Sequence, residues 1–105
     1  MTKEEVRLLS IALNKAQEES MKFANTEDGG TCNFDTPMIN IKATKKQISQ
    51  LEYRLEKCTW GLWKGWYFVE IPLSGQGNRR TRMAEAIARS LKNSGYETGV
   101  YYQVD

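Results

Sequence analysis

The chain has 105 residues, of which 40% are hydrophobic and 27% are charged, and its formal net charge is +2. This length is typical of one domain with one modest core and leaves no room for a second domain. The small net charge does not by itself indicate a nucleic-acid or membrane partner, and no apolar run approaches the roughly 18 residues of a membrane span. We therefore expect a single globular domain over residues 1–105, with no membrane partner.

The residue types that most enzymes and metal sites use are scarce. The chain has no histidine, which excludes a Ser-His or Cys-His nucleophile system and removes the commonest metal ligand. Cys32 and Cys58 lack the CxxC spacing of a zinc site and are expected to be buried free thiols. The N-terminal segment carries two glutamates where a signal peptide needs a basic and then an apolar region, so we expect a cytoplasmic protein. These features favour a protein that is not an enzyme and has no metal or cofactor.

Helical and extended patterns alternate along the chain. Helices are predicted over residues 3–24, 44–57 and 79–93, and extended segments over residues 31–42, 66–73 and 96–104. Apolar residues recur near every 3.5 positions in the first helix, and Thr44 with Gln47 forms a capping-box pattern at the start of the second. Gly95 is suited to end the third helix. Pro37 cannot donate a backbone hydrogen bond, so it predicts an edge strand or a bulge.

The order α-β-α-β-α-β predicts an α+β fold, with a three- or four-stranded sheet and its helices on one face. The core of this fold is expected within residues 30–105. The N-terminal helix, within residues 1–25, has an apolar stripe that is long for a domain of this size. This helix can therefore pack onto the core, or it can protrude and mediate the formation of a homo-oligomer.

The segment SGQGNRRTR, residues 74–82, connects the second predicted strand to the third helix. Asn78 is a good N-cap candidate, which places Arg79 and Arg80 in the first helical turn. Arg82 follows two residues later. A cation at a helix start opposes the helix dipole, at a cost of a few tenths to about 1 kcal/mol. This placement of positive charge therefore needs an explanation.

Two interpretations of these arginines compete. In the first, they form a solvated surface, and their aliphatic stems cover apolar residues. In the second, they enclose an anion together with the backbone N–H groups of Gly75, Gln76, Gly77 and Asn78. We favour the anion site, because a glycine-containing junction between a strand and a helix is a common position for ligand sites. The segment matches neither a Walker A loop nor a dinucleotide-binding fingerprint.

Polar and aromatic residues elsewhere can contribute to such a site. Asn33 and Asp35 either satisfy nearby backbone groups and cap a turn, or contact an arginine and the polar edges of a ribose or base. Most aromatic residues are expected in the core, but Trp63, Trp66 and Tyr101 are candidates to stack on a planar ring. Exposed aromatic residues would suit a protein interface equally well.

The strings GTCNFDTP, LSGQGNRRTRMAEAIARSLKNSGY and YYQVD together resemble a pattern in small uncharacterised proteins carried by phages and prophages of gut bacteria. The resemblance covers residues 30–105 and implies no site residues. Phage proteins of this size often counter host defence. Some sequester cyclic nucleotides or ADP-ribose-type signals, and others are anti-CRISPR proteins that block an effector by contact.

Three functions follow as hypotheses. The first is a non-enzymatic, phage-derived binding protein that sequesters a phosphate-bearing, nucleotide-type signalling molecule through the arginines. The alternative is an anti-CRISPR-like inhibitor of a host defence protein, or a nucleic-acid-binding protein, that acts through the basic third helix and exposed aromatic residues. The third is a small enzyme in which Asp35 or Glu70 serves as a base.

Overall fold

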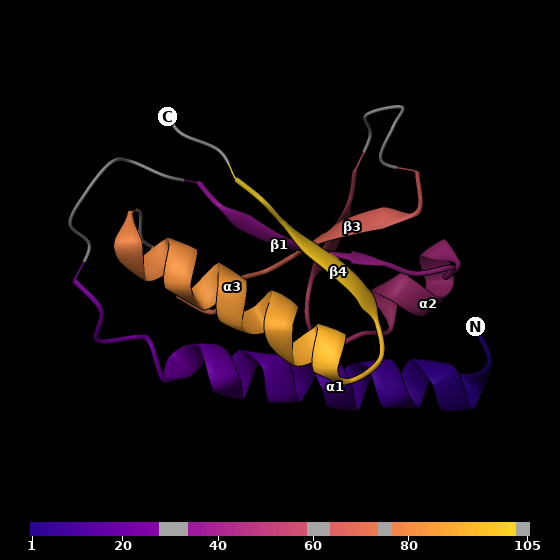
Figure 1. Ribbon diagram of the computed structural model, residues 1–105. Helices are drawn as coiled ribbons and strands as arrows, with labels where there is room; N and C mark the ends of the chain where they lie inside the picture. Colours follow the sequence, from indigo (N-terminus) through magenta and orange to yellow (C-terminus); the bar gives the residue numbers. More distant parts are fainter. Residues whose placement is uncertain (28–33, 59–63, 74–76, 103–105) are drawn as a thin grey trace.

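The computed structural model describes residues 1–27, 34–58, 64–73 and 77–102 (Figure 1). The described residues form three helices and four strands. In chain order these are α1 (Lys3–Met21), β1 (Thr36–Asn40), α2 (Lys45–Ser49), β2 (Leu55–Lys57), β3 (Trp66–Val69), α3 (Asn78–Asn93) and β4 (Glu97–Tyr101). None of the helices in the described part of the chain has both the length and the apolar character needed to cross a bilayer.

The four strands form one sheet in the order β2-β3-β1-β4, and each neighbouring pair is antiparallel. From β1 onward this is the connectivity of a split β-α-β arrangement, with α1 added before it. The α+β prediction, with a sheet of up to four strands, is confirmed. The two outer strands are β2 and β4, so the central positions fall to β3 and β1.

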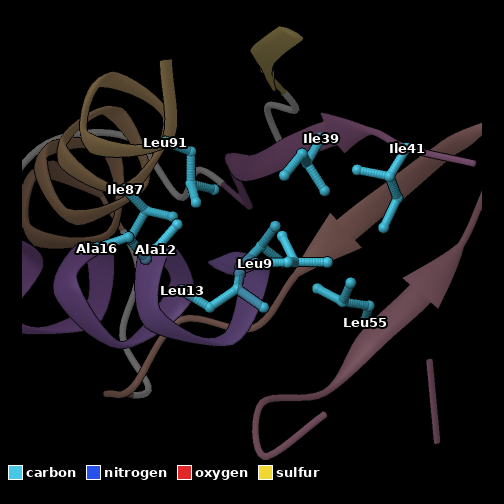
Figure 2. Packing of buried hydrophobic residues seen from close by; sticks show 10 residues of the cluster. Leu9, Ala12, Leu13, Ala16, Ile39, Ile41, Leu55, Ile87 and Leu91 are labelled. Carbon is cyan, nitrogen blue, oxygen red and sulfur yellow. The ribbon is translucent and has the colours of Figure 1, made fainter. Parts of the chain in front are cut away.

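Helices α1 and α3 cover one face of this sheet and form the core with it. They lie side by side and run in opposite directions (Figure 1). Their apolar side chains meet those of alternate strand residues (Figure 2). The buried cluster comprises Leu9, Ala12, Leu13, Ala16, Ile39, Ile41, Leu55, Val69, Ile87 and Leu91. Helix α1 therefore packs along the domain and supplies four residues of its core.

The capping box predicted at Thr44 is present, and α1 begins with a second one at Thr2. Thr2 Oγ1 accepts from the Glu5 N–H at 3.1 Å, and Glu5 Oε1 accepts from the Thr2 N–H at 2.9 Å. Thr44 and Gln47 make the same reciprocal pair at the start of α2. Each pair satisfies N–H groups that have no partner inside the helix, which fixes where the helix begins.

The predicted second helix is wrong in its second half. Helix α2 ends at Ser49, and residues 55–57 form β2, which pairs with β3. Leu55 reaches the core as a strand residue opposite Val69, and not as part of a helical stripe. The spacing of apolar residues fits both structures, so long-range pairing decided between them. Strand β3 is also shorter than the extended segment predicted over residues 66–73, because it ends at Val69.

The prediction for Pro37 is also wrong, because β1 is an inner strand between β3 and β4. The Ile41 N–H donates toward β3, to the Gly65 carbonyl at 3.1 Å. The side to which the backbone nitrogen points alternates from residue to residue along a strand. The nitrogen of Pro37, four residues before Ile41, therefore also points toward β3. The β1–β3 pairing ends at Met38 and Phe68. The missing N–H of Pro37 therefore faces a point where β3 no longer pairs with β1.

Cys58 is a buried free thiol, as predicted, while Cys32 lies outside the described residues. Burial raises the pKa of the Cys58 thiol, and the nearby Glu56 carboxylate raises it further. A raised pKa lowers the thiolate fraction, so this residue is expected to be chemically inert.

Two substitutions on α1 test the core. Leu13 is fully buried at 0% exposure, whereas Leu8 is 47% exposed on the same helix. We expect Leu13→Ala to lower the free energy of unfolding by about 2–5 kcal/mol because it removes contacts and leaves a cavity. Leu8→Ala should change it by only about 0.5 kcal/mol. Urea denaturation measures both, and equal losses would contradict the packing of α1 described above.

Candidate functional site

The first turn of α3 does not begin as the sequence predicts. Gly77 is the N-cap residue, with φ 70° and ψ −138°, and as a glycine it has no side chain with which to cap the helix. Asn78 is instead the first helical residue, so its prediction as N-cap is wrong. A side chain rarely tolerates a positive φ, which explains why glycine occupies the position at which the chain turns into the helix.

The buried residue Asp35 lies beside this first turn. Its exposure is 2%, and its Oδ2 accepts a hydrogen bond of 2.6 Å from Thr81 Oγ1. Thr81 Oγ1 also lies 3.1 Å from the Gly77 carbonyl oxygen. A carboxylate near the start of a helix is favourable because the helix dipole is positive there. The carboxylate of Asp35 therefore supplies part of the negative charge that stabilises the arginine-rich start of α3.

Arg80 extends from α3 to the beginning of β1. Its Nε donates to the Asp35 carbonyl at 2.9 Å, and its Nη2 donates to Thr36 Oγ1 at 3.2 Å. The guanidinium carbon lies 6.0 Å from the centre of the Phe34 ring, within the range of a cation–π contact. Burial lowers the pKa of Arg80, and the charge of Asp35 opposes that shift. These contacts hold the guanidinium group in one orientation.

Arg80 lines an open pocket of about 620 Å³. The pocket lies where the chain after β3 no longer pairs with β1, so its walls come from β1, the β2–β3 hairpin, residues 70–73 and α3. Four charged side chains surround it, which are Arg54, Glu56, Glu70 and Arg80. Within the described part of the chain, none of these four forms an ion pair. Their charges are therefore available to a ligand.

Two aromatic rings line the same pocket. The centres of the Phe68 and Tyr101 rings are 6.0 Å apart, and the ring planes meet at 65°. Their strands pair with Met38 and Thr36 of β1, so both rings are on the face of the sheet opposite Ile39. This is the face that α1 and α3 do not cover. The pocket therefore combines an aromatic surface with two cations and two carboxylates.

The structure brings together only part of the predicted site. Arg80 and Tyr101 line the pocket. Asp35 is connected to it because its carbonyl accepts a hydrogen bond from Arg80, and Gly77 lies nearby, where its carbonyl accepts from Thr81. Arg82 is exposed and Arg79 half-buried on α3, and neither lines the pocket. Trp66 is opposite Asn40, four residues along β1 from the Thr36–Tyr101 pair, which is roughly 13 Å away. Four predicted residues, Asn33, Trp63, Gly75 and Gln76, lie outside the described residues.

Phe68 of the pocket was not among the predicted site residues, and neither were two charged residues, Arg54 and Glu56. Both fall in the part of the predicted second helix that is in fact β2 or leads into it. In RLEK the buried Leu55 stands between charged residues, an alternation that is typical of an edge strand. Recognising that alternation would have placed Arg54 and Glu56 on the open face of the sheet.

Comparison with known protein families, curated proteins and solved structures gives no match. No relative therefore assigns a role to any residue of the pocket. Among the described residues, no three His, Cys, Asp or Glu side chains are grouped so that they could hold a metal ion. The chemistry that the pocket offers is recognition of charge, hydrogen-bond donors and a flat ring.

The Asp35 contact can be tested through Thr81. Thr81→Val keeps the shape of the side chain but removes the hydroxyl donor to a buried carboxylate. We expect it to lower the free energy of unfolding by about 1–3 kcal/mol. Thr81→Ser keeps the hydroxyl and should retain most of the stability. Thermal and urea unfolding compare the two variants, and a Val variant as stable as the Ser variant would show that this hydrogen bond does not contribute.

Proposed function

We propose that this chain is a non-enzymatic binding protein whose pocket takes a phosphate-bearing ligand with a planar ring, of the nucleotide type. The observation that carries the proposal is that Arg54 and Arg80 line the same pocket as Phe68 and Tyr101. A nucleotide offers the two complementary groups, an anion and an aromatic ring, at a fixed separation.

The phosphate would contact the arginines. A guanidinium group matches the oxygens of a phosphate with two parallel hydrogen bonds. Arg80 is already oriented by the Asp35 carbonyl and Thr36 Oγ1, so it would lose little conformational freedom on binding. Arg54 is exposed and would move to complete the contact.

The base and sugar would occupy the rest of the pocket. Phe68 and Tyr101 would contact the ring by stacking or edge contacts. Glu56 and Glu70 would accept hydrogen bonds from amino or hydroxyl groups and would repel further phosphates. Such a pocket favours a ligand that has its negative charge at one end and hydrogen-bond donors at the other.

Sequestration is the role that this proposal implies. A phage-derived counter-defence protein would act by holding a signalling nucleotide without altering it. The absence of histidine from the whole chain supports binding without turnover. A bound ligand should then be recovered chemically intact after the protein is denatured.

Binding is tested with ADP-ribose, a cyclic mononucleotide and a cyclic dinucleotide, by calorimetry and thermal unfolding. We expect one class to bind and Arg54→Gln to weaken it about tenfold or more, because a charge-assisted hydrogen bond is lost. Arg80→Gln should weaken it further, although it also removes two internal hydrogen bonds.

The matched control is Arg82→Gln, which removes the same charge from an exposed position of α3 outside the pocket. It should bind like the unaltered chain. If Arg54→Gln and Arg82→Gln weaken binding equally, the effect is one of overall charge and the pocket is not the site. If no compound of the panel binds, the proposal fails.

A second candidate is binding of single-stranded nucleic acid across the open face of the sheet. The observation that favours it is that Trp66 and Phe68, two residues apart on β3, are on the same face as Tyr101. Aromatic side chains along a sheet can stack successive bases.

Trp66→Leu distinguishes the two candidates, since Leu keeps apolar volume but has no ring. If an oligonucleotide follows the sheet, we expect weaker binding of a short single strand, with affinity that falls steeply with salt. Mononucleotide binding should change less, because Trp66 does not line the pocket. Fluorescence anisotropy measures the oligonucleotide, and an unchanged affinity in this variant would reject the sheet as its binding surface.

A further inference from the structure

A second, smaller hollow lies between α1 and α3, the two helices that cover the other face of the sheet. Its volume is about 230 Å³, below the usual range for organic ligands. Lys15 and Glu19 of α1 line it together with Ala86, Arg89, Ser90 and Asn93 of α3. It shares no lining residue with the pocket on the open face of the sheet.

Ser90 is the unusual residue of this hollow. It is 7% exposed, and its Oγ has no hydrogen-bond partner among the described residues. A serine inside a helix commonly bonds to a carbonyl of the preceding turn, which satisfies the hydroxyl locally. A buried hydroxyl with no partner is costly and uncommon in folded proteins. Ser90 lines the hollow while its Oγ is shielded from water, so a change of the Ser90 rotamer would let a ligand located there receive its hydrogen bond.

The charges around the hollow favour an anion. Lys15 and Arg89 are both exposed at its rim, and neither forms an ion pair within the described part of the chain. The single carboxylate, Glu19, is paired with Lys22 at 2.9 Å. Among the described residues that line the hollow, two are therefore unpaired cations, while the carboxylate of Glu19 is already engaged by Lys22.

We propose that this hollow binds a phosphate group. Ser90 Oγ and the Asn93 amide would donate hydrogen bonds to its oxygens, and Lys15 and Arg89 would balance its charge. The small volume suits inorganic phosphate or the phosphate of a small monoester. Since its ligands come from both helices, the anion would also hold α1 against α3. The proposal does not depend on the function assigned to the other pocket.

The test is thermal unfolding of the full chain with inorganic phosphate, and separately with glycerol 3-phosphate, at ionic strength matched with sodium chloride. We expect the unfolding temperature to rise by several degrees at saturation, because the ligand binds only the folded state. Phosphorus NMR titration gives the affinity directly. A response to inorganic phosphate identifies the free ion as sufficient, and a response to the monoester alone shows that its organic part is needed.

Two variants address the site, and two serve as controls. Ser90→Ala and Arg89→Gln should each weaken phosphate binding about tenfold or more. Arg82→Gln removes the same charge as Arg89→Gln but does not line the hollow, so binding should persist, whereas Arg54→Gln reports only on phosphate held in the other pocket. Without phosphate, Ser90→Ala should be as stable as the unaltered chain, because it removes a hydroxyl that has no partner.

The proposal would be overturned by either of two results. One is that neither phosphate compound shifts the unfolding temperature beyond the chloride control. The other is an equal shift in Ser90→Ala, Arg89→Gln and the unaltered chain, which would be a general salt effect on stability. Loss of binding in Arg54→Gln but not in Arg89→Gln would show that the anion binds in the pocket on the open face of the sheet.

Discussion

The start of β1 and the start of α3 are joined through one buried residue, Asp35. Its carboxylate accepts from Thr81 Oγ1, and its backbone carbonyl accepts from Arg80 Nε. The sequence places cations at the positive end of a helix dipole, and a buried carboxylate beside that turn offsets part of the cost. The same contacts fix Arg80 in place. These contacts hold the charged side chain of Arg80 at the wall of the candidate pocket, so the positive charge of the pocket depends on them.

The shape of the pocket follows from how the sheet ends. Pro37 has no N–H to offer toward β3, and the β1–β3 pairing ends at Met38 and Phe68. The chain after Val69 is then free of β1 and forms the opposite wall. Gln17 of α1 holds that wall from behind, because its Nε2 donates to the Glu70 carbonyl at 3.0 Å. The pocket thus lies where the inner strand β1 lacks the N–H of Pro37, and the hydrogen bond from Gln17 supports its wall.

The pocket on the sheet and the hollow between α1 and α3 differ in their electrostatics. The pocket on the open sheet face has two arginines and two glutamates, which suits a ligand with separated anionic and donor groups. The hollow between α1 and α3 has two cations, and Lys22 engages its one carboxylate. That arrangement suits a compact anion. The two hollows share no lining residue, although α3 contributes Arg80 to the first and Arg89 and Ser90 to the second.

Local interactions explain what the sequence determined. Capping boxes at Thr2 and Thr44 are made between residues three apart, so a short window of sequence contains both partners. The inward face of α3 follows from the helical period, because Met83, Ala84, Ile87, Ala88 and Leu91 recur at helical spacing and are all buried. Gly95, with φ 100°, follows the end of α3 as predicted. The α+β class followed from the order of these elements.

Only the tertiary structure decided the rest, because it depends on partners distant in the chain. Leu55 belongs to a strand because Val69 pairs with it, and this put Arg54 and Glu56 at the pocket. Asp35 and Thr81 are 46 residues apart, so the sequence could identify both polar residues but not their hydrogen bond. The sequence by itself determined the starts of α1 and α2, the buried face of α3 and an arginine-rich helix start that needed a negative charge. The packing of β1 against α3 decided that Asp35 supplies part of that charge, since burial and long-range contact are properties of the folded chain alone.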